Sequence, residues 1–201
     1  MKVVSLLGSP RSQGSSATIA SHLTETASGL GAQIHSFELN RLSYRGCQGC
    51  YLCKKKLDHC VLDDDLTEVL ATVQQADVVV LASPVYYGDL TSQLKGFIDR
   101  TFSYLKPDYL TSTQPSRLTP KKLVLILTQG HPDPALFGDI FGRYAFFMKW
   151  MGFTEVRLIR ACGLGPRNTV PEEVLREAEA AARELCGQIG QPVGATSDKA
   201  E

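Results

Sequence analysis

Residues 78–88 read VVVLASPVYYG, an unbroken apolar run followed by a loop with proline, glycine and two tyrosines. Runs of this kind are typical of strands that are buried on both faces of a parallel sheet. Four further apolar runs occur along the chain, so that five strands are expected. The five runs are residues 3–7, 34–39, 78–82, 123–127 and 156–159.

The segments between these runs carry helical patterns. The expected helices are residues 16–28, 66–75, 92–105, 134–151 and 171–189. Strands that alternate with helices indicate parallel βαβ units in an α/β fold.

The polarity of the runs predicts the strand order. The runs at 34–39 and 156–159 admit His35, Glu38 and Arg157, which is typical of edge strands, whereas the other three runs read as central strands. Central first, third and fourth strands give the flavodoxin-like, doubly wound order 2-1-3-4-5. A generic Rossmann-type sheet is the alternative, although 201 residues leave little room for its sixth strand. We expect one flavodoxin-like domain over residues 1–189, with a cysteine-rich loop at 47–60, and a disordered tail over 190–201.

The charge balance excludes several classes of partner. Lysine plus arginine and aspartate plus glutamate each number 21, so there is no electrostatic footprint for nucleic acid or anionic membrane. The first apolar run is too short for a signal peptide, and no later run approaches the ~18 residues of a membrane span. We therefore expect a cytoplasmic protein whose thiols stay reduced.

In the order 2-1-3-4-5, ligands bind between the first and third strands, beyond their carboxyl ends. The loop after the first strand, GSPRSQGSS at residues 8–16, offers the hydroxyls of Ser9, Ser15 and Ser16, the guanidinium of Arg11 and a helix N-terminus. These groups suit a phosphate monoester. The alternative is a serine-rich turn in which Ser15 or Ser16 caps the helix.

The loops after the third and fourth strands predict a site for a planar ring. Tyr86 and Tyr87 offer flat faces with polar tips, and the segment 128–131 would meet the ring from the other side. The alternative is that the tyrosines cover the sheet end or an oligomer contact, and His131 is expected to be solvated. A phosphate monoester beside a planar ring in this crevice indicates FMN.

Residues 47–60 read CQGCYLCKKKLDHC, with four of the six cysteines of the chain. Bacterial ferredoxins use a trio spaced as Cys47, Cys50 and Cys53 and complete the cluster with a distant cysteine, so Cys60 would have to loop back. Zinc and thiols without metal are the alternatives, although four-sulfur zinc sites usually form two separate pairs. Cys162 and Cys186 are expected to be buried small residues.

These motifs together resemble a known family. GSPRSQGSS, SPVYYGDLTSQLKGFIDR and TQG look like the flavin loops of the NAD(P)H-dependent FMN reductase family. With CQGCYLCKKKLDHC, the chain is similar over residues 1–160 to the iron–sulfur flavoprotein branch of that family. The resemblance implies FMN contacts from Ser9, Arg11, Gly14, Ser15, Ser16, Pro84, Val85, Tyr86, Tyr87, Gly88, Thr128, Gln129 and Gly130. It also implies one [4Fe–4S] cluster on Cys47, Cys50, Cys53 and Cys60. The six residues between Cys53 and Cys60 are one more than is common in related sequences.

The resemblance predicts an FMN-dependent oxidoreductase that carries electrons between a one-electron carrier such as ferredoxin and a two-electron partner. A cluster-free NAD(P)H-dependent FMN or quinone reductase and a redox-sensing flavin-binding protein are the alternatives. Lys54, Lys55 and Lys56 are expected to form a solvated loop face or a docking patch for an acidic carrier. Phe146 and Trp150 are expected on the outer face of a helix, which predicts a homodimer or homotetramer.

Overall fold

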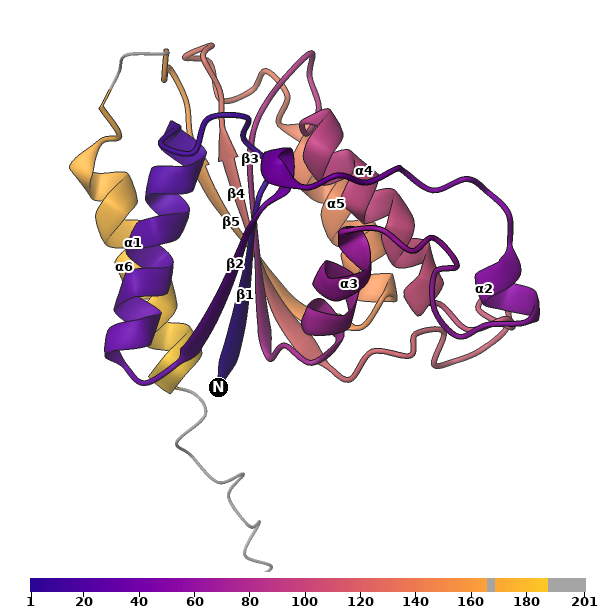
Figure 1. Cartoon of the computed structure of the whole chain (residues 1–201). Coiled ribbons are helices and arrows are strands. Elements are labelled where there is room, and N and C mark those ends of the chain that lie inside the picture. The colour runs from indigo at the N-terminus through magenta and orange to yellow at the C-terminus, as the bar shows by residue number, and fades with distance from the viewer. Residues whose placement is uncertain (166–168, 188–201) are drawn as a thin grey trace, which may run out of the picture.

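The computed structural model describes residues 1–165 and 169–187, and its centre is a five-stranded parallel sheet in the order β2-β1-β3-β4-β5 (Figure 1). The predicted flavodoxin-like order is therefore confirmed. The strands are β1 (Lys2–Leu7), β2 (Gln33–Glu38), β3 (Val78–Pro84), β4 (Lys121–Thr128) and β5 (Phe153–Ala161). The expected tail over residues 190–201 lies outside the described residues.

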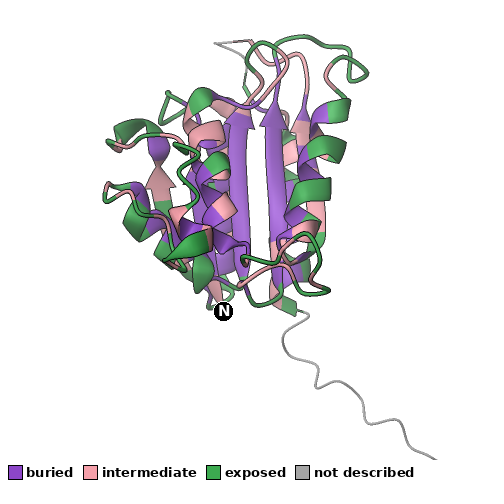
Figure 2. Ribbon diagram, turned by 90° about the vertical axis from the view of Figure 1, so that its right-hand side faces the viewer, coloured by how far each residue is buried: buried purple, intermediate pink, exposed green. Residues whose placement is uncertain are grey.

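The three central strands are buried along almost their whole length, as Figure 2 shows. Every residue of β3 from Val78 to Ser83 is buried, because helices cover both faces of the sheet. The outer strands β2 and β5 are mostly half-buried or exposed. Edge strands tolerate polar side chains such as His35 and Arg157 for this reason, so the edge assignment from the sequence is confirmed.

Two helical layers enclose the sheet (Figure 1). The helices α1 and α6 pack side by side over one face, and α3, α4 and α5 cover the other face. Each layer has its own apolar core. The helices are α1 (Ser15–Gly29), α2 (Leu52–Lys55), α3 (Leu66–Gln74), α4 (Ser92–Arg100), α5 (Asp139–Trp150) and α6 (Glu172–Gly187), with 3₁₀-helices η1 (Leu39–Arg41) and η2 (Thr101–Tyr104).

The structure corrects two helix boundaries. The helix expected over 92–105 ends at Arg100 and continues as η2. The helix expected from residue 134 begins at Asp139, because Phe137 adopts a left-handed conformation with φ 64°. Such a residue cannot continue a right-handed helix.

The outer face of α5 also differs from the prediction. Phe146 is 69% exposed as expected, but its exposed neighbour is Phe147 at 52%. Trp150 is half-buried and packs edge-on against Tyr109, with ring centroids 5.5 Å apart. The segment that supplies Tyr109 joins α4 to β4 and has no local sequence pattern that would place it there.

The cysteine segment leaves the carboxyl edge of the sheet after β2, but it does not stay there. In Figure 1 it runs outward past α4 and forms α2 at the side of the molecule. Within the described residues, no helix is long and apolar enough to cross a membrane.

Candidate functional site

The loop after β1 forms one end of a cavity at the carboxyl edge of the sheet. Ser9 and Ser16 are buried there, whereas Arg11 is exposed. The Ser9 hydroxyl accepts a hydrogen bond from the Arg11 amide at 3.1 Å, which folds the loop back on itself. A Cβ on Gly14 would lie 2.9 Å from the Ser9 Oγ, so only glycine fits at this position without displacement.

The N-terminus of α1 opens into the same cavity. Its N-cap is Gly14, which has no side chain to bond the free amides, and no acidic residue lies in the first turn. The alternative reading, in which Ser15 or Ser16 caps the helix, is therefore wrong, because both residues lie within the helix. The amide groups and the positive end of the helix dipole remain available to an anion.

Thr91 joins the first loop to the second. Its buried hydroxyl donates to the Gly8 carbonyl at 2.7 Å, and its amide donates to the Ser83 Oγ at 3.1 Å. The same hydroxyl also caps α4 by accepting a hydrogen bond from the Leu94 amide. Thr91 thus fixes the distance between the two loops that border the cavity.

The second loop turns sharply at its tip. Tyr86 and Asp89 exchange backbone hydrogen bonds of 2.9 and 3.0 Å, and Tyr87 between them has a left-handed φ of 50°. The Asp89 carboxylate accepts hydrogen bonds from Tyr144 and Arg143. Burial raises the pKa of Asp89, but these bonds outweigh that effect and hold it below its ordinary value. The turn is therefore rigid, and it presents the Tyr87 side chain fully to solvent.

The third loop is held by β5. The Arg160 guanidinium donates to the Gln129 side chain and to the carbonyls of Pro134 and Leu136. The Gln129 amide group in turn donates to the carbonyls of His131 and Asp133 at 2.9 and 2.8 Å. The Gln129 side chain is thus occupied in shaping its own loop, and His131 is exposed as expected.

These loops enclose a cavity of about 470 Å³. Ten of the thirteen predicted cofactor residues line it: Ser9, Arg11, Gly14, Ser15, Ser16, Pro84, Val85, Tyr86, Thr128 and Gly130. Tyr87, Gly88 and Gln129 do not line it in this structure. One end of the cavity offers serine hydroxyls, the Arg11 cation and a helix N-terminus, which fit a phosphate. The other end is bordered by Pro84, Val85 and Tyr86, which fit a planar ring joined to that phosphate.

The sequence reasoning missed one wall of this cavity. Leu164, Gly165, Thr169 and Val170, from the segment after β5, also line it, as do Gln13 and Thr18. The strand order could have predicted this wall, because every loop at the carboxyl edge of a parallel sheet, including the one after β5, can border the crevice.

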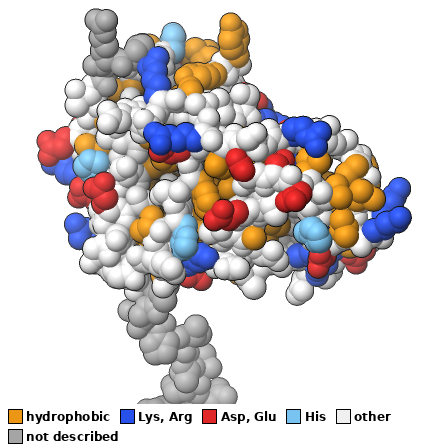
Figure 3. Space-filling model, in the orientation of Figure 1, with side chains coloured by type: hydrophobic (Ala, Val, Ile, Leu, Met, Phe, Trp, Pro, Cys, Tyr) orange, Lys and Arg blue, Asp and Glu red, His pale blue; other side chains and the backbone are white. Residues whose placement is uncertain are grey.

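All four cysteines of residues 47–60 line a second, separate cavity of about 30 Å³. Cys53 is buried, Cys60 is half-buried, and Cys47 and Cys50 are exposed. The rest of the lining is largely apolar and includes Tyr51, Val61, Leu62 and Phe102. Figure 3 shows hydrophobic side chains gathered on the surface at this side of the molecule.

Lys54 and Arg100 place positive charge beside the cysteines. The Lys54 ammonium lies 3.5 Å from the Cys53 Sγ and donates to the carbonyls of Phe102 and Leu105. Burial lowers the pKa of Lys54, although the Cys53 sulfur acts in the opposite direction. Lys54 is thus not part of a solvated face, whereas Lys55 and Lys56 are exposed as expected. Arg100 is the second cation and lines the cavity itself.

The donor set fits an anionic metal–thiolate group. Four cysteines and the Arg100 guanidinium line one largely apolar cavity, and the Lys54 ammonium contacts the Cys53 sulfur. Among the described residues, no three side chains of metal-ligand type are close enough to share a single ion. In a [4Fe–4S] cluster each cysteine binds a different iron, so its sulfurs stand farther apart than the ligands of one zinc ion.

The two cavities have no lining residue in common. Thr91, which is bonded to the Gly8 carbonyl of the first loop, and Arg100, which lines the cysteine cavity, stand at opposite ends of α4, about 13.5 Å apart along the helix at 1.5 Å per residue. Within one chain, the cysteines therefore line a cavity separate from the one that the flavin-type loops border.

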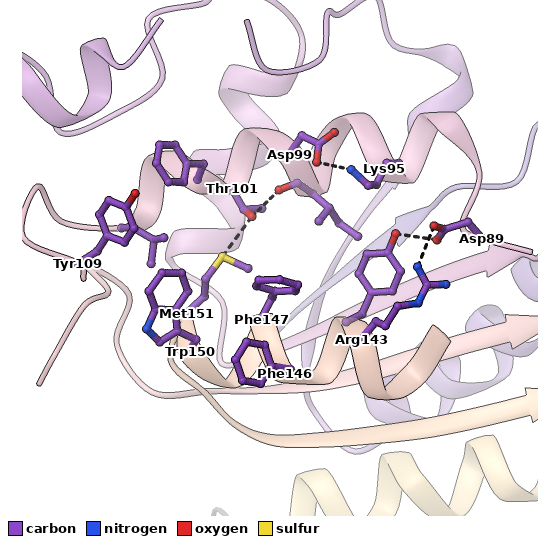
Figure 4. A pocket seen from close by; sticks show the side chains of 14 residues that line it. Asp89, Lys95, Asp99, Thr101, Tyr109, Arg143, Phe146, Phe147, Trp150 and Met151 are labelled. Carbon is purple, nitrogen blue, oxygen red and sulfur yellow. Dashed lines mark hydrogen bonds and ion pairs between the residues drawn. The ribbon is translucent and has the colours of Figure 1, made fainter. Parts of the chain in front are cut away.

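A third cavity, of about 740 Å³, lies between α4 and α5 (Figure 4). Its aromatic residues are Phe102, Tyr109, Tyr144, Phe146, Phe147 and Trp150. Its charged groups are paired with one another, Lys95 with Asp99 and Arg143 with Asp89. Small-molecule sites usually offer a few free polar groups that orient the ligand. This cavity resembles an apolar contact surface instead.

A family model described as NADPH-dependent FMN reductase matches residues 1–133. An iron–sulfur flavoprotein of Archaeoglobus fulgidus is 36% identical over 104 residues, which are 52% of this chain and 47% of that protein. An FMN-dependent NADH:quinone oxidoreductase of Pseudomonas aeruginosa is 34% identical over 126 residues, 61% of this chain and 60% of that protein. The chain spans about half the length of the first of these relatives.

A solved NAD(P)H:quinone oxidoreductase from Methanothermobacter marburgensis superposes with a TM-score of 0.70 at 21% identity. The superposition covers 96% of this chain and 99% of that one. At this identity the likeness concerns the fold, and it extends over the whole sheet and both helical layers.

Proposed function

Since the chain belongs to the NADPH-dependent FMN reductase family, we propose that it is an FMN-dependent oxidoreductase of the iron–sulfur flavoprotein type, which carries electrons between a one-electron carrier and a two-electron partner. The observation that carries this proposal is the pair of cavities. One is bordered by phosphate and ring loops, and the other is lined by all four clustered cysteines. Bound FMN supplies two-electron chemistry, and a [4Fe–4S] cluster supplies one-electron transfer.

In this proposal the first cavity holds the FMN. Ser9, Ser15, Ser16 and the amides at the start of α1 bind the phosphate, and Arg11 adds a charge from the exposed side. Pro84, Val85 and Tyr86 face one side of the ring, and Thr128 and Gly130 face the other. The amides of Val85 and Tyr86 already donate within the protein, so these residues orient the ring by packing.

The cysteine cavity holds the cluster through Cys47, Cys50, Cys53 and Cys60. Lys54 and Arg100 offset the negative charge of the four thiolates. The exposed Lys55 and Lys56 lie beside this cavity and provide a docking face for an acidic carrier such as ferredoxin. A reducing, cytoplasmic setting follows from this proposal, because exposed thiols such as Cys47 must stay available as ligands.

A second copy of the chain covers the aromatic cavity between α4 and α5 in this proposal. Phe146 and Phe147 are exposed there, and the charged side chains of the cavity pair with one another. A homodimer or homotetramer would also let the cysteines of one copy approach the flavin of another. Light scattering tests this: F146S/F147S should reduce the mass to that of a monomer, and a monomeric wild-type chain contradicts it.

The cluster-free NAD(P)H-dependent reductase is the second candidate, because the relative from Pseudomonas aeruginosa is named an NADH:quinone oxidoreductase. The two candidates differ in their electron donor. Reduced ferredoxin or NADPH is added to the FMN-loaded protein without oxygen, and the flavin absorbance is followed.

The proposal predicts that ferredoxin bleaches the flavin of the wild-type protein and that Cys53→Ala abolishes this bleaching. Cys186→Ala, on α6, is the matched control and should behave as wild type. Bleaching by NADPH alone, at equal rates in all three proteins, contradicts the proposal and supports the second candidate.

A further inference from the structure

Arg100 is a buried cation at the end of α4, with only 1% of its surface exposed. Its guanidinium donates to the Arg45 carbonyl at 2.9 Å and to the Leu62 carbonyl at 3.2 Å. It also forms an ion pair with Asp64 at 2.8 Å. Burying a guanidinium is costly unless it is paired and hydrogen-bonded, so these contacts define the place of Arg100 closely.

The partners of Arg100 flank the cysteine segment on both sides. Arg45 lies two residues before Cys47, and Leu62 lies two residues after Cys60. Asp64 reinforces this link, since its carboxylate also accepts hydrogen bonds from the Arg45 amide at 3.3 Å and the Leu66 amide at 3.1 Å. One guanidinium therefore ties together the start and the end of residues 47–60.

Arg100 also lines the cavity that the four cysteines share. Its Nε is buried without a hydrogen-bond partner among the described residues. A guanidinium stays protonated at any ordinary pH, so Arg100 places a permanent positive charge at the cysteine cavity.

We infer that Arg100 is the positioning residue of the cysteine site: by clamping both flanks it brings Cys60 to the cavity that Cys47, Cys50 and Cys53 line. This inference rests on the proposed function and deepens it. The clamp compensates for the six residues between Cys53 and Cys60, which would otherwise leave the fourth sulfur free to move. The charge of Arg100 also stabilises the more negative, reduced state of the group that the thiolates hold.

Lys121 provides a matched control for the loss of a buried cation. It is 2% exposed and donates to the carbonyls of Gln74 and Ala76 at 2.8 and 2.7 Å. These contacts lie at the opposite edge of the sheet, where β4 begins. Lys121→Met should therefore destabilise the fold without affecting the cysteine segment, whereas Arg100→Met should affect both.

The first test uses the metal-free chain and hydrogen exchange read by mass spectrometry. In R100M, amides of residues 43–47 and 60–66 should exchange about tenfold faster than in wild type, because the clamp no longer holds them. In K121M these two segments should exchange as in wild type. Equal exchange of both segments in R100M and K121M overturns the inference.

The second test uses the anaerobically reconstituted protein. R100M should bind less than half the iron and sulfide of wild type, and the cluster that it retains should have a more negative midpoint potential. FMN affinity should stay within about twofold, because Arg100 is remote from the flavin cavity. R100K keeps the positive charge but lacks the forked donors of a guanidinium. Its midpoint potential should therefore be closer to that of wild type than its iron content is.

Wild-type iron content together with a wild-type potential in R100M overturns the inference. If R100M does not fold, R100K decides by the same two readouts. If the wild-type chain takes up no iron and sulfide, the proposed function fails, while the hydrogen-exchange comparison still decides whether Arg100 positions the cysteine segment.

Discussion

Thr91→Val tests how the two flavin loops are joined. The substitution keeps the shape of the side chain but removes the hydroxyl that donates to the Gly8 carbonyl and caps α4 at Leu94. Loss of an N-cap costs about 1 kcal/mol. A buried carbonyl left without its donor costs about 1–3 kcal/mol. We therefore expect the free energy of unfolding to fall by about 3 kcal/mol, since both effects act together.

For a chain of this length, that loss lowers the melting temperature by roughly 6–12 °C. FMN affinity should also fall severalfold, because the Gly8 loop is no longer fixed against the start of α4. Urea unfolding of the FMN-free protein, followed by circular dichroism, measures the first effect. Quenching of FMN fluorescence on binding measures the second.

Thr24→Val is the matched control. Thr24 is also buried, but its hydroxyl donates to the Ala20 and Ser21 carbonyls within α1, which the helix already satisfies. Its loss should therefore cost less than about 1 kcal/mol and leave FMN affinity unchanged. If T91V is no less stable than T24V, the reasoning about the Gly8 carbonyl is refuted.

Three further substitutions test separate parts of the structure. Burial raises the pKa of Asp64, but the hydrogen bond from Arg100 outweighs burial and holds that pKa below its ordinary value. The ion pair therefore stabilises the fold above about pH 4, and this stabilisation is lost as the pH falls further. The stability difference between wild type and D64N, from urea unfolding, should thus shrink below pH 4, and a pH-independent difference contradicts the account. Gly142→Ala, at an open position in α5, should raise stability by about 0.5–1 kcal/mol in thermal unfolding, and any loss would refute this. Gly14→Ala should weaken FMN binding about tenfold in equilibrium dialysis, because its Cβ would meet the Ser9 hydroxyl, and unchanged affinity would show that the loop can adjust.

The sheet and the first cavity could be predicted because their signals are local. Strands buried on both faces lack polar alternation, so the run at 78–82 identifies a central strand without any knowledge of its neighbours. His35 and Arg157 identify edges in the same way. The strand order then places the loops that follow β1, β3 and β4 around one crevice, and ten of the predicted residues do line it.

The surroundings of the cysteines could not be predicted, because they depend on contacts between residues far apart in sequence. Lys54 reads as a solvated lysine in the run KKK, yet it donates to carbonyls 48 and 51 residues away. Arg100 lies inside the helix expected over residues 92–105, and nothing near it in sequence indicates Arg45 or Leu62 as partners. Burial of these cations follows only once the chain between α4 and β4 is folded against α2.

The count of iron, sulfide, zinc and FMN per chain after anaerobic purification tests the central claim most directly. The account predicts one FMN with about four iron and about four sulfide per chain in the wild-type protein. It also predicts loss of the iron, with FMN retained, in Cys60→Ala. A wild-type chain that carries FMN with zinc, or with no metal at all, would contradict it.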